Sequence, residues 1–285
     1  MYYPISLIIG SIIAVMITIN GWLTARYGMY TAAVIIHIVG LIVIMIVLFI
    51  KKDKPFAKMH PWYFYLGGAI GVATTVFNNL AFGRISVSAI MALLLFGQSI
   101  FGLIIDQYGL MGMPKHPFTK GKLAGLILML GGIAVMMNQF EIVAVIVSFI
   151  AGLNIIVSRT IGAKLGELTN VRISTFYNYL IGLVVAIPVL LFFGRNEQLF
   201  TGFTFYPSIY LYLGGAFGVI VILVSNILVV KISAFYLTLL IFMGQVFAGV
   251  LIDVFISGAF DPRNLIGGIL VAFGLGVNLL IDRKN

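Results

Sequence analysis

Long, uninterrupted apolar stretches constrain this chain more than any other feature of its sequence. A helix needs about 20 mainly apolar residues to cross the hydrocarbon core of a bilayer, which is about 30 Å thick. Ten stretches meet that requirement, at about 5–24, 29–50, 62–83, 86–110, 121–138, 141–161, 171–193, 207–230, 233–256 and 264–281. They lack the period-2 alternation of a membrane barrel. We therefore expect an all-α integral membrane protein with ten transmembrane helices.

Composition excludes the other classes of protein. Hydrophobic residues make up 62% of the 285 residues and charged residues only 9%, against about 25% charged residues in soluble domains. A soluble fold could not hide so much apolar surface, and a disordered chain would be poor in it. The chain has no cysteine, which excludes disulfides and thiolate metal sites. We expect neither a cofactor nor a metal.

The distribution of cations predicts the orientation in the membrane. Ten spans place both termini on one side, and 13 of the 17 Lys and Arg residues fall on that side. The other four are Arg26, Arg84, Arg195 and Arg263. The positive-inside rule then predicts a multi-pass protein of the cell membrane with both termini in the cytoplasm. No basic face is interleaved with base-stacking aromatic residues, so a nucleic-acid partner is not expected.

The chain contains an internal repeat. Residues 65–106 align without gaps with residues 212–253, and 16 of the 42 positions are identical. The matches include polar residues in register, such as Asn79 with Asn226, Gln98 with Gln245 and Asp106 with Asp253. Unrelated apolar helices would not share their polar residues in this way. The sequence therefore predicts two five-helix repeats, residues 1–138 and 139–285, that together form one transmembrane domain.

An odd number of helices in each repeat has a topological consequence. The second copy must enter the membrane from the opposite face, which makes the two copies an inverted-topology repeat. Two similar halves in opposite orientations can exchange conformations, so that a central cavity opens first to one side and then to the other. The repeat therefore predicts a secondary transporter that works by alternating access through a midplane cavity.

Ten helices in two inverted halves, the repeated motif Tyr-Leu-Gly-Gly-Ala-x-Gly-Val at 65–72 and 212–219, and the paired Gly-Gln positions resemble the drug/metabolite transporter superfamily. Within it, the chain resembles a fused two-repeat member of the YdcZ-like branch. That resemblance implies a small-molecule transporter. Small multidrug resistance relatives carry an essential Glu in their first helix, whereas Ile12 to Ile17 here contain no carboxylate. This departure argues against proton-coupled export of hydrophobic cations.

Polar residues inside the apolar stretches are the candidates for a substrate site, because polar groups in hydrocarbon are costly. Gln98 and Gln245 lie at the midpoints of their stretches, and inversion preserves that depth. Both can therefore line one chamber and offer amide donors and acceptors to a polar solute. The alternative is that each Gln bonds across a helix interface as structural glue.

Four asparagines and one histidine extend the candidate set. Asn79 and Asn226 are repeat mates at opposite depths, and they either line the site or bond neighbouring helices. Asn20 and Asn154 are further candidates. His37 is the only titratable side chain near the midplane and could carry a coupling proton, or it could be a neutral histidine bonded to a carbonyl.

Two carboxylates are candidates for gates. Asp106 and Asp253 lie near opposite ends of their helices, where each could pair with a cation and close one side of the cavity. The alternative is that both are ordinary interfacial residues.

Other functions remain as alternatives to solute transport. A groove of Asn and Gln residues open to lipid would suit a lipid scramblase or flippase, and a channel-like facilitator is also possible. An intramembrane enzyme is not expected, because the stretches hold a single His and no midplane carboxylate. The expected partners are the bilayer, a small-molecule substrate and a coupled proton or ion. Fusion of the two repeats favours a monomer.

The cation count generates a test of orientation. The Cys-free chain accepts single cysteines at Lys54, expected in the cytoplasm, and at Asn196, expected near the outer face. In intact cells, a membrane-impermeant thiol reagent should label Asn196→Cys and not Lys54→Cys. The reverse labelling pattern would overturn the orientation.

Overall fold

The computed structural model of the protein describes residues 2–56, 59–110, 122–137, 141–202, 204–228, 234–258 and 260–284. Within these ranges, the side chains of residues 106, 226–227, 234–239, 278–279 and 281–284 are outside the description. The regular structure of the described part is helical, apart from one isolated bridge between Phe82 and Ile85.

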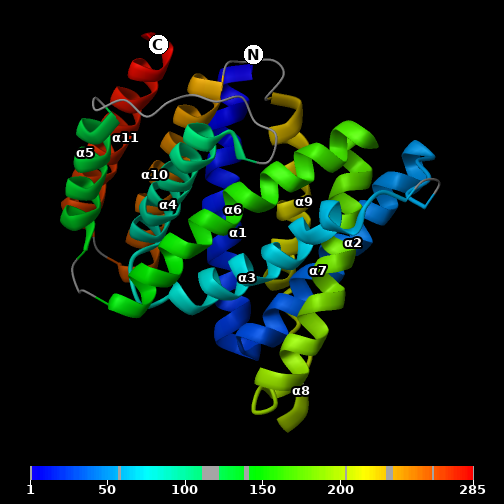
Figure 1. The fold of residues 1–285 in the computed structure, drawn as a ribbon. Coiled ribbons are helices and arrows are strands. Elements are labelled where there is room, and N and C mark those ends of the chain that lie inside the picture. The colour runs from blue at the N-terminus through cyan, green and yellow to red at the C-terminus, as the bar shows by residue number, and fades with distance from the viewer. Residues whose placement is uncertain are drawn as a thin grey trace. The chain divides into compact units, whose positions relative to one another are not determined.

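The helices follow the apolar stretches (Figure 1). Their bounds are α1 Tyr2–Tyr27, α2 Met29–Lys51, η1 Trp62–Tyr65, α3 Leu66–Ala81, α4 Val87–Tyr108, α5 Lys122–Met136, α6 Ile142–Leu168, α7 Val171–Phe193, α8 Gln198–Thr201, η3 Ile209–Tyr212, α9 Gly214–Leu228, α10 Ala234–Ser257 and α11 Pro262–Lys284. Six of the described helices are long and apolar enough to cross a membrane: α1, α2, α4, α6, α7 and α10. Shorter apolar helices occur in α5, α9 and α11. The full set of ten spans stays a prediction.

One helix is longer than the apolar pattern indicates. The sixth apolar stretch ends near residue 161, whereas α6 continues to Leu168. Its last turns carry charged residues, and Lys164 forms an i,i+3 ion pair with Glu167, with 3.2 Å between Nζ and Oε2. Such pairs support a helix without adding hydrophobicity, so the hydrophobic pattern alone ends too early.

The chain forms two compact units, and neither unit coincides with one sequence repeat. Unit 1 comprises residues 1–15, 81–153 and 227–285, and unit 2 comprises residues 16–80 and 154–226. Each unit therefore takes helices from both halves of the sequence. Helices α1 and α6 contribute one part to each unit.

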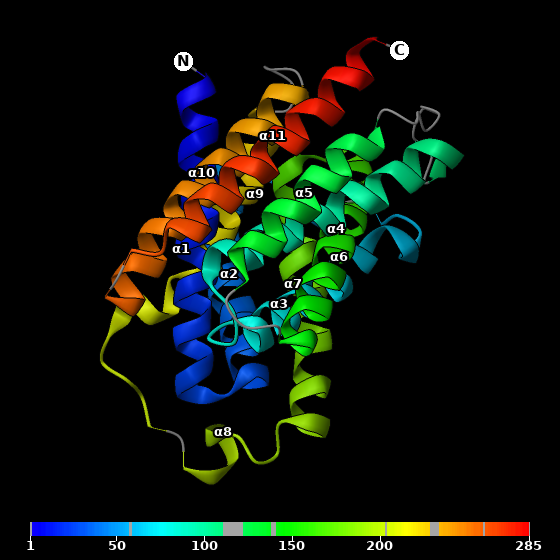
Figure 2. The same cartoon turned by 90° about the vertical axis from the view of Figure 1, so that its left-hand side faces the viewer.

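In unit 1, α5 packs along α11 in antiparallel fashion (Figure 2). Small residues allow this approach, because a Cβ on Gly132 would lie 2.5 Å from the carbonyl oxygen of Gly267. A Cβ on Gly274 would lie 2.6 Å from the carbonyl oxygen of Gly125. Gly125 and Gly132 occupy the same repeat positions as Gly267 and Gly274, so the contact is reciprocal. Leu93, Met129, Phe242 and Val271 are among the residues that fill the core beside it.

In unit 2, α2 and α7 form the corresponding antiparallel pair (Figure 1). Glu197, which follows α7, accepts hydrogen bonds from the backbone N–H groups of Tyr30 and Thr31 at 3.1 and 2.7 Å and from the Thr31 hydroxyl at 2.8 Å. The N-cap residue of α2 is Gly28, which has no side chain to cap the helix. A carboxylate from a distant segment therefore satisfies these N–H groups and faces the positive end of the helix dipole.

Gly28 is required at this cap for two reasons. Its φ of 97° lies in the left-handed region, which residues other than glycine adopt only at an energetic cost. A Cβ at this position would also lie 2.2 Å from the Cδ atom of Glu197. The space that the missing side chain leaves is the space that the Glu197 carboxylate occupies.

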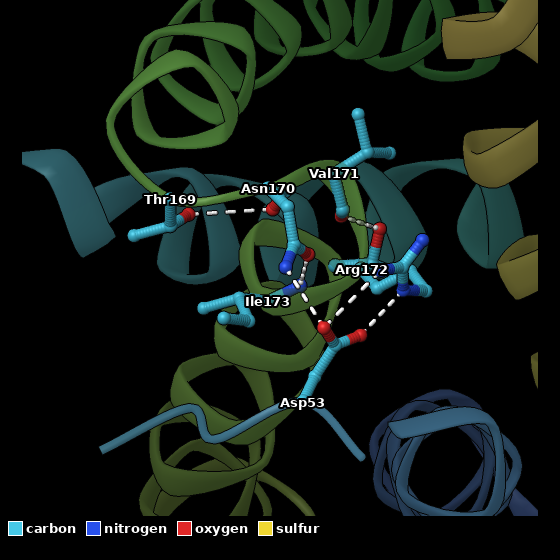
Figure 3. A network of polar contacts seen from close by, with 7 residues as sticks. Asp53, Thr169, Asn170, Val171, Arg172 and Ile173 are labelled. Atoms are coloured by element: carbon cyan, nitrogen blue, oxygen red, sulfur yellow. Dashed lines mark hydrogen bonds and ion pairs between the residues drawn. The ribbon is translucent and has the colours of Figure 1, made fainter. Parts of the chain in front are cut away.

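The opposite ends of α2 and α7 are joined by a second carboxylate (Figure 3). Asp53, which follows α2, accepts hydrogen bonds from Nε and Nη2 of Arg172 and from Nδ2 of Asn170. Asn170 is the N-cap of α7, and its Oδ1 accepts from the Ile173 N–H at 2.9 Å. The Arg172 hydrogen bond, with help from its charge and from Asn170, lowers the pKa of the Asp53 carboxyl below its ordinary value.

Gly131 and Gly132 give a matched test of the α5–α11 contact. Gly132→Ala should lower the free energy of unfolding by about 1–3 kcal/mol, because the new methyl group meets backbone atoms that cannot move aside. Gly131 is exposed, and a methyl group added there would have no atom within 4 Å. Gly131→Ala should therefore leave stability unchanged or raise it slightly. Thermal unfolding of the purified protein in detergent measures both, and equal losses would contradict the contact.

The Asp53 ion pair gives a pH-dependent prediction. Because the folded pKa of Asp53 lies below the unfolded value of about 3.9, its stabilisation is full above that value and is lost as pH falls through the folded pKa. Asp53→Asn should cost roughly 1 kcal/mol at pH 7, and the difference from wild type should shrink below about pH 4.

An exposed ion pair serves as the control for this prediction. Lys164 and Glu167 pair on the surface of α6, with Glu167 67% exposed. Glu167→Gln should change stability by less than about 0.5 kcal/mol at either pH. A gap between Asp53→Asn and wild type that persists unchanged to pH 3 would exclude the carboxylate charge as its cause.

Candidate functional site

The two glutamines lie on a packed helix pair of unit 1. Gln98 is on α4 and Gln245 is on α10, and these helices pack against each other in antiparallel fashion, with Gly249 of α10 against Ser88 of α4. Both glutamines are partly exposed. Nε2 of Gln98 donates to the Leu94 carbonyl of its own helix at 3.2 Å, and Gln245 forms no hydrogen bond with a described residue. Within the described part of the chain, neither amide bonds a neighbouring helix, which leaves donor and acceptor capacity for a solute.

A glycine beside each glutamine brings a second helix close. A Cβ on Gly97 would lie 2.2 Å from the Phe149 carbonyl oxygen of α6, and one on Gly152 would meet the Leu94 carbonyl oxygen of α4 at the same distance. The counterpart crossing joins α10 to α1, where a Cβ on Gly244 would lie 2.1 Å from Leu7 O and a Cβ on Gly10 would lie 2.0 Å from Ile241 O. The glycines next to the glutamines therefore serve helix packing, and each crossing places its glutamine at a fixed point.

Burial along α4 changes near Gln98. Every residue from Val87 to Leu95 is buried, whereas residues 98–103 are all partly exposed. The helix thus has one closely packed half and one half that is partly accessible. Gln98 lies at the start of the accessible half.

Asp253 caps the start of α4, and no cation among the described residues pairs with it. Its carboxylate accepts from the backbone N–H groups of Val87 and Ser88 at 2.7 and 3.1 Å and from the Ser88 hydroxyl. Nδ2 of Asn264 donates to it at 3.3 Å. These bonds join the end of α10 to the start of α4. The hypothesis of a cation-paired gate is not needed to explain this residue.

Two candidate side chains lie outside the described residues. They belong to Asp106 on α4 and Asn226 on α9. Their roles as a gate and as a site residue stay predictions.

His37 and Tyr179 occupy equivalent positions on α2 and α7 in unit 2. Their ring centroids are 5.9 Å apart. Each ring lies over a glycine of the opposite helix: a Cβ on Gly182 would meet His37 Cδ2 at 2.3 Å, and one on Gly40 would meet Tyr179 Cε1 at 2.1 Å. Nδ1 of His37 is 2.7 Å from the Ala33 carbonyl oxygen. This geometry favours a packing role for His37 over a proton-carrying role.

The remaining asparagines have different surroundings in unit 2. Asn79 is 4% exposed and donates through Nδ2 to the Met29 carbonyl at the start of α2, at 3.4 Å. Asn20 is 8% exposed, and its Oδ1 occupies the space that a Gly214 side chain would need. That oxygen has no hydrogen-bond partner among the described residues. Asn154, on α6, is partly exposed. Asn79 therefore resembles helix glue more closely than Asn20 or Asn154 does.

The sequence analysis counts Arg159, near the end of the stretch 141–161, among the cations of the cytoplasmic side. In the structure it lies inside α6, nine residues before that helix ends at Leu168. A signal is available, because Lys164 and Glu167 can pair at i,i+3 spacing and so extend the helix beyond the apolar run.

No group of three or more His, Cys, Asp or Glu residues in the described part of the chain could hold a metal ion. The candidates Gln98, Gln245, Asn20 and Asn154 all carry amides, which can bind and orient a solute by hydrogen bonding.

Comparison with solved structures shows a shared fold. Seventeen chains match. One of them, described only as "Crystal structure of protein", has a TM-score of 0.61 and 14% sequence identity, and the match covers 99% of this chain and 96% of that one. A search of curated proteins gave no match.

A protein-family model matches the chain twice. The model is that of the DMT_YdcZ family, described as "Putative inner membrane exporter, YdcZ", and it covers residues 1–135 and again residues 143–277. The two matches correspond to the two sequence repeats and confirm the resemblance that the repeated motifs indicated. This chain therefore belongs to the YdcZ family of the drug/metabolite transporter group, as a fusion of two family units.

Proposed function

We propose that this protein is a secondary transporter that exports a small organic solute by alternating access between two inverted repeats. Its family is one of inner membrane exporters, which favours a transporter over an enzyme. The proposal adds the mechanism, the use of the two glutamines and the cytoplasmic location of both termini.

The pairing of equivalent contacts is the observation that carries the proposal. The crossing of α4 with α6 at Gly97 and Gly152 has a counterpart in the crossing of α10 with α1 at Gly244 and Gly10. The carboxylate after α2 binds the start of α7, and the carboxylate after α7 binds the start of α2. Alternating access requires two arrangements of similar free energy. Contacts that occur in equivalent pairs supply that similarity. When the two repeats exchange conformations, each contact is replaced by the equivalent contact of the other repeat, so the two arrangements keep similar free energies.

Gln98 and Gln245 are the residues that we assign to the solute. Each is held at a glycine crossing and keeps unused hydrogen-bonding capacity. Gln98 also lies where α4 passes from its packed half to its accessible half. A solute with a polar group can therefore bond an amide from either repeat while the surrounding contacts exchange.

Replacing each glutamine by leucine tests this assignment. Leucine keeps much of the bulk and removes the hydrogen bonds, so a polar group of the solute is left unpaired. That loss should cost roughly 1–3 kcal/mol, or about 5- to 150-fold in apparent affinity. Currents from proteoliposomes on a solid-supported membrane, screened against small metabolites at two pH gradients, identify a solute and measure the change.

Gln198, on the short helix α8, provides the matched control. Gln198→Leu removes an amide outside the candidate spans and should leave transport unchanged. Thermal unfolding in detergent checks that the three variants fold. If Gln98→Leu and Gln245→Leu both fold and transport the solute with unchanged affinity and rate, the glutamines are helix glue. Movement of lipid reporters without solute currents would instead favour a scramblase.

A further inference from the structure

The repeated motif Tyr-Leu-Gly-Gly begins with a tyrosine in each copy, Tyr65 at the end of η1 and Tyr212 at the end of η3. In both copies this tyrosine bonds the backbone of the chain that leads into its own motif. The Tyr65 hydroxyl accepts from the His60 N–H at 2.9 Å. The Tyr212 hydroxyl accepts from the Tyr206 N–H and donates to the Tyr206 carbonyl, both at 3.2 Å. Each motif tyrosine therefore holds the chain that precedes it.

Tyr177, on α7, completes the contact in the first copy. Its ring centroid lies 4.5 Å from that of Tyr65, and its hydroxyl donates to the Pro55 carbonyl at 3.0 Å. Two tyrosines from different elements thus bond the chain that leads from α2 into η1, at Pro55 and at His60. We call Tyr65 and Tyr177 the first tyrosine clamp. It lies at the Asp53 end of the α2–α7 pair, because Pro55 follows Asp53 by two residues.

Tyr27, the last residue of α1, completes the contact in the second copy. Its hydroxyl lies 2.5 Å from that of Tyr212. It also accepts from the Tyr206 N–H at 2.9 Å and donates to the Thr204 carbonyl at 3.1 Å. We call Tyr27 and Tyr212 the second tyrosine clamp. It lies at the opposite end of the α2–α7 pair, because Tyr27 directly precedes Gly28, the N-cap of α2.

A polar cavity adjoins the first clamp. Tyr65 and Tyr177 line it, and its other lining residues are Phe64, Gly67, Gly68, Gly162, Leu165, Ser174 and Asn178. Its volume of about 10 Å³ corresponds to a single water molecule. The Asn178 amide bonds no described residue, so it keeps donors and an acceptor for a molecule that enters. A solute larger than water can reach this amide only when the clamp opens.

Unpaired polar atoms adjoin the second clamp as well. Asn20 and Thr24 share one face of α1 with Tyr27, at i, i+4 and i+7 spacing. Asn20 Oδ1 and Thr24 Oγ1 are shielded from solvent and have no hydrogen-bond partner among the described residues. The chain after Thr24 repeats the chain after Gly162, as Ala-x-x-Gly, and Gly162 lines the cavity at the first clamp. The two clamps therefore adjoin equivalent polar positions.

From the matching clamps and the polar groups beside them, we infer that the two tyrosine pairs are the gates of the transport cycle, and that each opens one end of unit 2 to water and solute. The inference rests on the proposed transport function and adds its gating residues. Each clamp consists of a few hydrogen bonds of modest net strength, so it can open while the surrounding helices stay folded. Equivalent bonds at the two ends give both gates similar strength, as alternating access requires.

Two buried positions report gate opening in the Cys-free chain. Thr24→Cys places a thiol beside the second clamp, and Ser174→Cys places one in the cavity at the first clamp. In lipid nanodiscs, iodoacetamide reaches both ends of the protein, so the two rates require neither a known orientation nor a known solute. Tyr27→Phe should raise the rate at Thr24→Cys by about five- to tenfold and change the rate at Ser174→Cys by less than about twofold. Tyr177→Phe should have the reverse effect.

Tyr63 and Tyr210 provide matched controls. Each stands two residues before a motif tyrosine, half of each side chain is exposed, and neither hydroxyl bonds a described residue. Tyr63→Phe and Tyr210→Phe keep the rings and should change either rate by less than about twofold. Thermal unfolding in detergent checks that all the variants fold.

Two outcomes would overturn the inference. Rates that Tyr27→Phe and Tyr177→Phe leave unchanged would show that the clamps do not control access. A rise of both rates in either variant would show a general loosening of unit 2 and not two separate gates. These rates are measured without transport. A chain whose clamps respond as expected but that moves no solute would therefore count against the proposed function and not against the clamps.

Discussion

Helices in a bilayer gain little by hiding apolar surface from one another, because lipid chains are as apolar as leucine. Close van der Waals contact must then hold them together, and small residues permit it. The described helices of this protein meet at glycines, where a methyl group would lie 2.0–2.6 Å from a backbone carbonyl oxygen of the partner. The α5–α11 pair and the two glutamine-bearing crossings all depend on this contact.

The second requirement of the fold is electrostatic. The first N–H groups of a helix have no partner within that helix, and hydrocarbon offers none. Here Glu197 and Asp253 supply the missing acceptors for α2 and α4 from distant segments, and Asp53 binds the start of α7 through Asn170 and Arg172. These three carboxylates are thus used at helix ends. Arg159 is the contrasting charge, because it lies within a helix and has no described acidic partner.

Much of this fold follows from the sequence, since the apolar stretches predict the long helices and the repeat predicts which helices are equivalent. The roles of single polar residues follow less well. The sequence leaves Asp253 as either a gate or an ordinary interfacial residue, and it gives no sign that the carboxylate caps α4, because its partner lies 166 residues away. The apolar stretch 141–161 contains Arg159 but ends before Lys164 and Glu167, so the last turns of α6 become clear only in the structure.

The contacts of Gly10 and Gly152 set α1 and α6 in register, since each glycine meets the equivalent residues of α10 and α4. Seven residues beyond each glycine stand Ile17, which is 3% exposed, and Arg159. In a homodimer of identical five-helix chains, this position would have to be either arginine in both chains or isoleucine in both chains. Joining the two copies in one chain removes that restriction, so a single arginine can be introduced without its symmetry mate. Duplication followed by fusion thus permits a charged residue at one of two equivalent positions and an apolar residue at the other.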